Sequence, residues 1–242
     1  MFRRKSGYEQ VDGGTIDLGN GEAPITFRHN KRARRMILRP DPKTGGAIVT
    51  LPPGTDYETA REFVEDRAGW LMTRLATTPE LVDFAPGAVV PYLGFDHEIR
   101  HMPDMRGHGP VVCEDGLLLV SGKVEHLARR LRDWMKKQAR EEITRQAGIM
   151  AGALHKTHGR ITIRDTRSRW GSCSSTGGLN FSWRLIMAPD WVLDYVVAHE
   201  VAHLVEHNHS KHFWKQVALI SDDVDRACKW LKQNGTRLHQ YG

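Results

Sequence analysis

The chain has 242 residues, and its 35 lysines and arginines against 29 aspartates and glutamates give a formal net charge of +6. This length supports a substantial core in one large or two small domains without disulfides. Cys113, Cys173 and Cys228 are widely spaced and form no CxxC pair, which excludes a secreted disulfide framework and a zinc knuckle. The modest cation excess favours acidic partners only weakly.

The N-terminal sequence MFRRKSGYEQVDGG is basic but has no apolar segment after the charges, so we expect no signal peptide. No apolar stretch approaches the roughly 18 to 20 residues of a membrane span. The longest one, WVLDYVVAHEVAHLV, is interrupted by Asp194, His199, Glu200 and His203. We therefore expect a soluble, cytoplasmic protein without membrane association.

The first half of the chain predicts two groups of short strands on either side of a helix. TIDLG, ITFRH, RRMILRP and AIVTLPP are separated by Gly, Asn, Pro and Asp, and the basic run KRARR at 31–35 is interpreted as a solvated strand face. A helix of about five turns follows over YETAREFVEDRAGWLMTRL, with Thr55 as its N-cap. VVPYLGFDHEIRHM and PVVCEDGLLLVSG then predict further strands, with a turn at residues 114–116.

The second half begins with a long amphipathic helix over residues 124–154. Its apolar stripe consists of Leu127, Leu131, Trp134, Met135, Ala139 and Ile143. RITIRD predicts a strand, and a second strand is expected over residues 179–186, between glycine turns and Pro189. Proline is tolerated at the start of a helix, so WVLDYVVAHEVAHLVEH is expected to begin there.

These elements predict an α+β fold in which a small sheet packs on the helix that contains the sequence HEVAH. A β-rich region with one helix precedes it. A soft boundary near residues 121–123 divides the chain into an N-terminal region, 1–121, and a C-terminal domain, 122–242. We find no internal repeat in the sequence.

The sequence HEVAH predicts a metal site. His199 and His203 are four residues apart, so on a helix both imidazoles lie on one face and reach one ion. A catalytic zinc uses three protein ligands and leaves one position to water, so a third ligand is required. His209 is the expected one, provided that the helix ends before it, and Asn208 tolerates the left-handed conformation that ends helices.

Other ligands and roles stay open at this point. His207, His212, Glu206 and the acidic residues Asp222, Asp223 and Asp225 are weaker rivals for the third ligand position. Zinc lowers the pKa of a bound water toward about 7, and Glu200 is expected to take its proton as general base. The attack of water on a carbonyl group forms an oxyanion. The residues that could stabilise it are Tyr195, Tyr241, His212 and the arginines of TRSRW, and the sequence does not choose among them.

Three segments carry a resemblance to a known family: RDTRSRWGSCSS, GGLNFSWRLIMAP and DYVVAHEVAHLVEHNHSKHFW, in that order. With them the chain resembles the bacterial YgjP-like metallopeptidases, which are related to SprT-like and Wss-type proteases. The resemblance implies that residues 122–242 form a zincin-like metallopeptidase domain. It further implies zinc, peptidase activity, ligands at His199, His203 and His209, and a catalytic Glu200. Metzincins share the histidine spacing, but they have Gly where this chain has Glu206 and need a methionine turn, whereas the last methionine here is Met187.

The RWGSC segment is interpreted chiefly as packing, with Trp170 as an anchor and Gly171 in a tight turn. The strand over residues 179–186 is a candidate for holding an extended substrate by backbone hydrogen bonds. Cys173 is interpreted as a small buried thiol in preference to a metal ligand.

The expected partner is a protein or peptide substrate. SprT-like relatives act on DNA-bound proteins, so weak nucleic-acid association is a secondary expectation. The alternative function is a nucleic-acid-associated or protein-binding module with a non-catalytic zinc site. It is disfavoured because structural zinc sites have four protein ligands.

Overall fold

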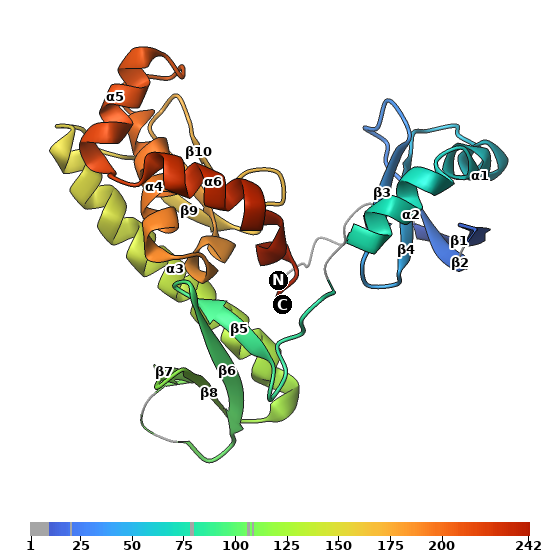
Figure 1. The fold of residues 1–242 in the computed structure, drawn as a ribbon, viewed down its shortest axis with the longest axis horizontal. Helices are drawn as coiled ribbons and strands as arrows, with labels where there is room; N and C mark the ends of the chain where they lie inside the picture. The colour runs from blue at the N-terminus through green and yellow to red at the C-terminus, as the bar shows by residue number, and fades with distance from the viewer. Residues whose placement is uncertain (1–9, 20, 78–79, 106, 108) are drawn as a thin grey trace. The chain divides into compact units, whose positions relative to one another are not determined.

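The computed structural model describes residues 10–19, 21–77, 80–105, 107 and 109–242. The chain divides into two compact units, Met1–Leu81 and Val82–Gly242 (Figure 1). We expect no signal peptide in the N-terminal sequence MFRRKSGYEQVDGG, and residues 1–9 of it lie outside the described residues. Among the described helices, none has the length and apolar character to cross a membrane.

The first unit contains a four-stranded sheet covered by two helices. The strands are β1 (Gln10–Asp17), β2 (Glu22–His29), β3 (Ile37–Asp41) and β4 (Gly46–Leu51), and the helices are α1 (Tyr57–Glu65) and α2 (Ala68–Thr77). The strand order is β1-β2-β4-β3, with β2 and β4 parallel and the outer pairs antiparallel. All four strands confirm the prediction for this region.

The prediction of one long helix in this unit is wrong. The N-cap is Asp56, whose Oδ1 accepts from the backbone N–H of Thr59 at 2.7 Å, and the helix breaks after Glu65. The break lets both short helices bury apolar side chains, Val64 on α1 and Leu71 on α2, in the same core.

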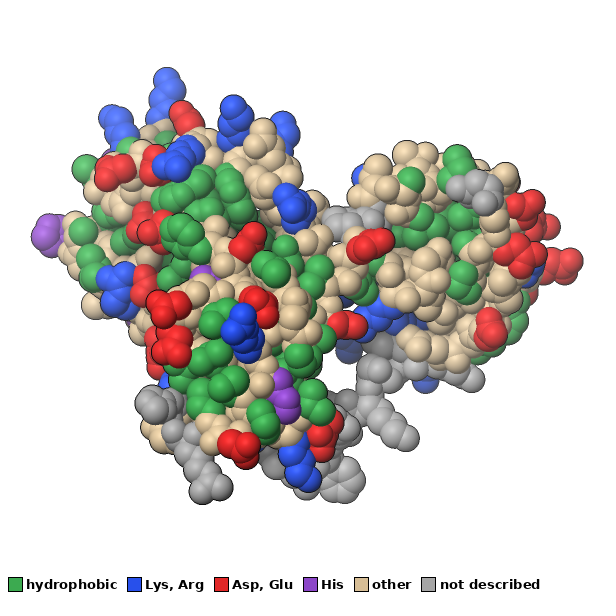
Figure 2. Space-filling view, turned by 60° about the horizontal axis from the view of Figure 1, so that its bottom comes forward, with side chains coloured by type: hydrophobic (Ala, Val, Ile, Leu, Met, Phe, Trp, Pro, Cys, Tyr) green, Lys and Arg blue, Asp and Glu red, His purple; other side chains and the backbone are tan. Residues whose placement is uncertain are grey.

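The basic run at 31–35 does not form a strand face. It lies in the loop before β3, and four of its five side chains are exposed. On the face shown in Figure 2, lysines and arginines stand among aspartates and glutamates. This arrangement agrees with a solubilising surface.

The second unit starts with another four-stranded sheet, made of β5 (Val89–Tyr92), β6 (Phe95–Met102), β7 (Val111–Glu114) and β8 (Leu117–Ser121). Its order is β5-β6-β8-β7, with β6 and β8 parallel. The predicted turn at residues 114–116 is confirmed, since Asp115 (φ 46°) and Gly116 (φ 73°) have the two positive φ angles of a type I′ hairpin.

Helix α3 (Leu127–Ala153) runs through the second unit and follows a short 3-10 turn, η1 (Val124–His126). Its predicted apolar stripe is buried, with Trp134 partly so. Leu131 on α3 shares one core with Leu118 and Val120 on β8. The strands before residue 121 thus pack on α3, which follows it. For this reason the division between the two units lies at Leu81 and Val82, before the expected boundary at 121–123.

A three-stranded sheet follows, formed by β9 (Ile161–Arg164), β10 (Gly171–Cys173) and β11 (Leu179–Ser182). The order is β10-β11-β9, which places β11 in the centre. The expected strand to residue 186 stops at Ser182, whose side chain caps the 3-10 helix η2 (Trp183–Met187). A central strand has no free edge, so the assignment of substrate pairing to this strand is wrong.

The remaining elements are α4 (Asp190–Ala202), α5 (Lys211–Ile220), α6 (Val224–Asn234) and the 3-10 helix η3 (Gly235–His239). Helix α4 begins after Pro189, as expected, but it ends with His203 as its C-cap, well before Asn208. Asn208 is not among the described residues with positive φ, so it does not end the helix as predicted. The α+β class is confirmed, with three small sheets, helices and a histidine cluster at the end of α4.

Candidate metal centre

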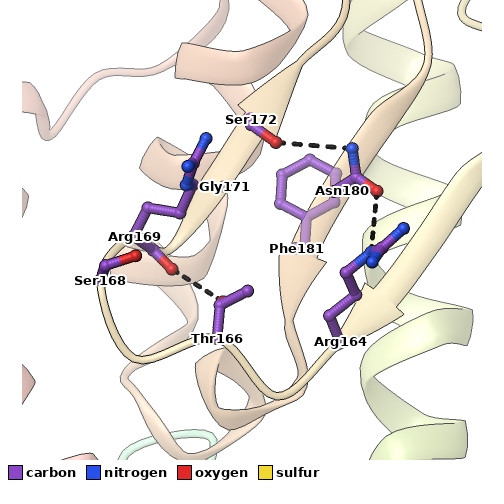
Figure 3. A pocket seen from close by; sticks show the side chains of 8 residues that line it. All are labelled: Arg164, Thr166, Ser168, Arg169, Gly171, Ser172, Asn180 and Phe181. Carbon is purple, nitrogen blue, oxygen red and sulfur yellow. Dashed lines mark hydrogen bonds between the residues drawn. The ribbon is translucent and has the colours of Figure 1, made fainter. Parts of the chain in front are cut away.

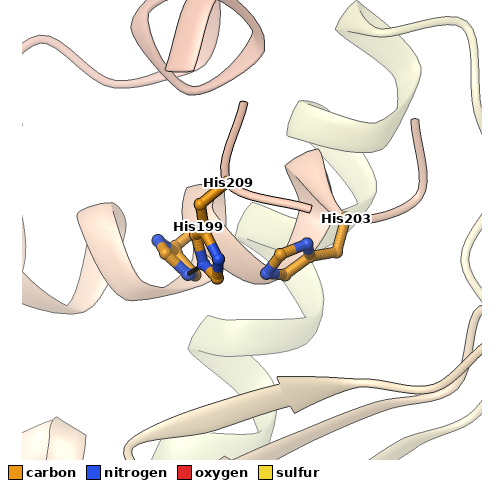
Figure 4. Close-up of side chains that lie close together, drawn as sticks. All are labelled: His199, His203 and His209. Carbon is orange, nitrogen blue, oxygen red and sulfur yellow. Dashed lines mark hydrogen bonds between the residues drawn. The ribbon is translucent and has the colours of Figure 1, made fainter. Parts of the chain in front are cut away.

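Three histidine rings converge where α4 ends (Figure 4). His199 lies in α4, His203 is its C-cap, and His209 lies in the loop before α5. One ring nitrogen from each histidine lies within 4.8 Å of the other two, and Nε2 of His199 is 3.0 Å from Nε2 of His209. The ring centroids are 4.9 to 5.1 Å apart in all three pairs, so the rings form a nearly equilateral triangle.

The outer nitrogens of two rings have partners. Nδ1 of His203 donates to the carbonyl oxygen of Glu206 at 3.0 Å, and Nδ1 of His199 is 3.5 Å from the Tyr195 hydroxyl. A carbonyl oxygen only accepts, so the proton of His203 is on Nδ1 and the lone pair is on Nε2. Such contacts fix the orientation of a metal-binding imidazole.

Helix α5 supports the triangle from one side. Its buried residue Phe213 has its ring centroid 4.9, 4.5 and 4.8 Å from those of His199, His203 and His209. Ser210 caps the same helix by accepting from the backbone N–H of Phe213 at 3.3 Å. The cap directly follows His209, so it orders the loop that brings the third ring to the first two.

Burial and mutual proximity favour the neutral imidazoles of His199 and His203. Desolvation, followed by the charges that His203 and His209 would carry, lowers the pKa of His199 to about 4. Desolvation also lowers the pKa of His203. Neutral imidazole is the form that binds metal ions, so the donor set suits a divalent cation at neutral pH.

Glu200 is buried, with 7% of its surface exposed, and faces strand β10. A Cβ on Gly171 would lie 2.5 Å from Cγ of Glu200, so this position has room only for glycine. Burial raises the pKa of Glu200 to about 7, although the backbone N–H of Cys173, which donates to its carboxylate, and the charge of Arg169 oppose the rise. Gly171 thus makes room for Glu200 and does not form the expected tight turn.

The rival ligands stay outside the cluster, which among the described residues contains His199, His203 and His209 alone. His207 and His212 are exposed, and Glu206 contributes its backbone carbonyl to His203. The acidic residues at 222–225 and Cys173 are likewise not part of the group.

The oxyanion candidates remain unassigned. The Tyr195 hydroxyl accepts from the Cys228 thiol at 3.0 Å and lies on the Nδ1 side of His199, whereas Nε2 of His199 contacts His209. The carbonyl of Tyr241 accepts from Arg184. The packing interpretation of Trp170 is supported, since its ring stacks on His239 with centroids 5.1 Å apart.

Sequence reasoning missed two parts of the site. Strand β10 has only three residues, Gly171–Cys173, too few to show a pattern. The second missed part is Phe213. Ser210 before a helical segment is a recognisable N-cap signal, and it could have placed Phe213 in the first turn of α5.

One comparison with known proteins identifies a family for the chain. The sequence model of the YgjP-like metallopeptidase domain matches residues 34–234. Among solved structures, the crystal structure of the metallopeptidase zymogen of Pyrococcus abyssi abylysin is similar at 20% identity and a TM-score of 0.35, covering 40% of this chain and 95% of that one. The search of curated proteins found no match. Since the family match covers most of its length, the chain belongs to the YgjP-like metallopeptidase family.

Proposed function

We propose that the chain is a zinc-dependent peptidase in which His199, His203 and His209 bind the ion and Glu200 is the general base. The strongest support is that three imidazoles converge beside the buried carboxylate of Glu200, which lies next to His199 in α4. Three neutral imidazoles form the ligand set of some catalytic zinc sites. Tetrahedral ligands about 2.0 to 2.1 Å from zinc lie about 3.3 Å apart, near the 3.0 Å between Nε2 of His199 and Nε2 of His209.

When bound, zinc supplies a Lewis acid that lowers the pKa of a water toward about 7 and polarises a carbonyl group. Glu200 takes the proton of the attacking water and delivers it to the leaving amine. Burial, which raises the pKa of Glu200, favours the protonated form that delivers the proton to the amine. The backbone N–H of Cys173 holds the carboxylate in place meanwhile.

Strand β10 is the best-placed element to hold the substrate. It pairs with β11 on one side and is the edge strand of its sheet. It also runs against the Glu200 side chain at Gly171. An extended peptide that pairs with the outer edge of β10 gains backbone hydrogen bonds close to the general base, whatever its sequence.

A reducing compartment suits the three cysteines, all of which have free thiols. Disulfides persist mainly in oxidising compartments. We therefore propose a cytoplasmic location, where the substrates would be intracellular proteins or peptides.

The test combines metal analysis with peptide cleavage for the wild type, His209→Ala and Glu200→Gln. We expect about one zinc per chain in the wild type and in Glu200→Gln, and much less in His209→Ala, which loses one of three ligands. Cleavage by Glu200→Gln should fall by about 100- to 10,000-fold, since the general base is lost.

The matched control is Glu125→Gln, an exposed glutamate before α3, which should leave both metal content and cleavage unchanged. Undiminished cleavage by Glu200→Gln would contradict the assignment of the base. Full zinc retention in His209→Ala would contradict the assignment of the third ligand.

A further inference from the structure

A pocket of about 290 Å³ opens beside strand β10. Its polar lining comes from β9, from the loop that follows β9, and from β10 and β11 (Figure 3). The polar side chains that line it are Arg164, Thr166, Ser168, Arg169, Ser172 and Asn180.

The lining carries positive charge and hydrogen-bond donors without a carboxylate. In Figure 3 the side chains of Arg164 and Arg169 flank those of Ser172 and Asn180. Nε of Arg164 donates to Oδ1 of Asn180 at 3.3 Å, and the Asn180 amide donates to the Ser172 hydroxyl at 3.4 Å. Within the part of the chain that is described, neither guanidinium takes part in an ion pair.

This charge pattern fits an anion with two acceptor oxygens. A guanidinium presents a planar fork of N–H donors that matches a carboxylate, and such charge-assisted bonds are about twice as strong as neutral ones. The hydroxyl of Ser168 and the amide of Asn180 add weaker donors at the same place.

The alternation of side chains along β10 connects the pocket to the catalytic side of the sheet. Gly171 faces Glu200, as the 2.5 Å approach of its would-be Cβ shows, so the next residue, Ser172, faces the opposite side. Ser172 contacts Asn180 on that side. Gly171 and Ser172 both line the pocket, so a peptide paired with the edge of β10 lies beside the pocket as well as close to Glu200.

We propose that this pocket is a substrate subsite that binds a carboxylate through Arg164 and Arg169. The inference rests on the proposed function, because the pairing of a peptide with β10 brings the substrate to the pocket. Two sources supply the same group, namely an Asp or Glu side chain and the free C-terminus of the substrate.

The test measures peptide binding, not cleavage, using the zinc-loaded full chain with Glu200→Gln. The probes are three rhodamine-labelled peptides read by fluorescence anisotropy. One is a C-terminal amide with a central Glu, one is the same amide with Gln, and one is the Gln peptide with a free C-terminus. We expect one carboxylate peptide to bind about tenfold more tightly than the Gln amide, and the identity of that peptide tells which source the pocket takes.

The arginines are tested by Arg164→Gln and Arg169→Gln, with Arg167→Gln as the matched control in the same loop. Arg167 is exposed and does not line the pocket. The tenfold preference should disappear in the first two variants and persist in the control. The urea midpoint of each variant verifies that it is folded.

Equal binding of all three peptides, or no measurable binding of either carboxylate peptide, would overturn the subsite. So would an equal loss in Arg167→Gln, which would indicate a diffuse charge effect. Tighter binding of a single-stranded oligonucleotide, lost in the same two variants, would overturn it in favour of nucleic acid.

Cleavage by the wild type keeps the two proposals apart. If neutral and acidic peptides bind equally well and are cleaved equally fast, the subsite proposal is wrong and the peptidase proposal is supported. If acidic peptides bind through the arginines and none is cleaved, the pocket is a carboxylate-binding site and the peptidase proposal fails.

Discussion

At the scale of single residues, Gly171 is the position that the structure constrains most sharply. In Gly171→Ala the new methyl group would lie 2.5 Å from Cγ and 2.6 Å from Oε1 of Glu200, so the carboxylate must move. We expect cleavage to fall at least about tenfold, with a loss of about 1 to 3 kcal/mol of stability from overpacking. Zinc content should be unchanged.

The control for this change is Gly148→Ala in α3, where an added Cβ meets no atom within 4 Å. It should be neutral or stabilise by about 0.5 to 1 kcal/mol, because alanine favours the helix. Cleavage by Gly171→Ala at the wild-type rate would show that the carboxylate position does not matter for the reaction.

His239 predicts a dependence of stability on pH. Burial, then the charges of Arg184 and Arg167, lowers its pKa, and within the described residues its Nδ1 is buried without a hydrogen-bond partner. The unfolded chain, with an ordinary histidine pKa near about 6.5, therefore binds more protons as the pH falls. The stability that neutral His239 contributes is present above that pH and is lost below it, as the pH falls toward the lowered pKa.

We expect His239→Phe, which keeps the ring stacked on Trp170, to weaken the decline in unfolding free energy between about pH 7 and about pH 5. Urea unfolding of both proteins at the two pH values, in a chelator so that metal release plays no part, measures this. Identical declines would contradict the assignment.

At the scale of elements, the start of α5 determines where His209 lies. Ser210→Ala removes the acceptor for the backbone N–H groups of His212 and Phe213. We expect a loss of about 1 kcal/mol of stability and a severalfold weaker zinc affinity, since the loop with the third ligand loosens. Competition with a chelator of known affinity measures the second effect.

Asp56→Ala is the matched control, because it removes the N-cap of α1 in the other unit, where Asp56 accepts from Thr59 at 2.7 Å. It should cost a similar free energy of unfolding and leave zinc affinity unchanged. An equal effect of both substitutions on zinc would show that α5 does not position the ligand.

Several elements were predictable because their signals are local. The stripe of α3 and the turn at Asp115 and Gly116 follow from spacing and turn chemistry alone. The break after Glu65 and the early end of α4 were not, because the helical pattern of the sequence continues through both points. The segments that follow the two breaks bury Leu71 of α2 and Phe213 of α5.

At the scale of the whole molecule, the two four-stranded sheets have the same strand order and the same strand senses. The sequence shows no repeat that would reveal this likeness. Topology depends on the alternation of apolar residues and on turns, which many sequences satisfy.

We propose that residues 82–242 form the folding unit of the metal centre. A fragment of these residues should unfold cooperatively in urea and bind about one zinc. A fragment of residues 122–242 should not, because it lacks Val90, Ile99, Leu118 and Val120, which share a buried core with α3. Circular dichroism and metal analysis distinguish the two, and a cooperative, zinc-binding 122–242 fragment would contradict the proposal.

The sequence alone determined the α+β class, the apolar stripe of α3 and the three histidines as candidate ligands, because each depends on residue type and short spacing. Tertiary structure alone decided that β10 is the edge strand beside Glu200, that Phe213 lies against all three imidazoles, and that Arg164 and Arg169 line one pocket. These contacts join residues that are distant in the chain or that belong to elements too short for a pattern. Only the packing of a common core brings them together.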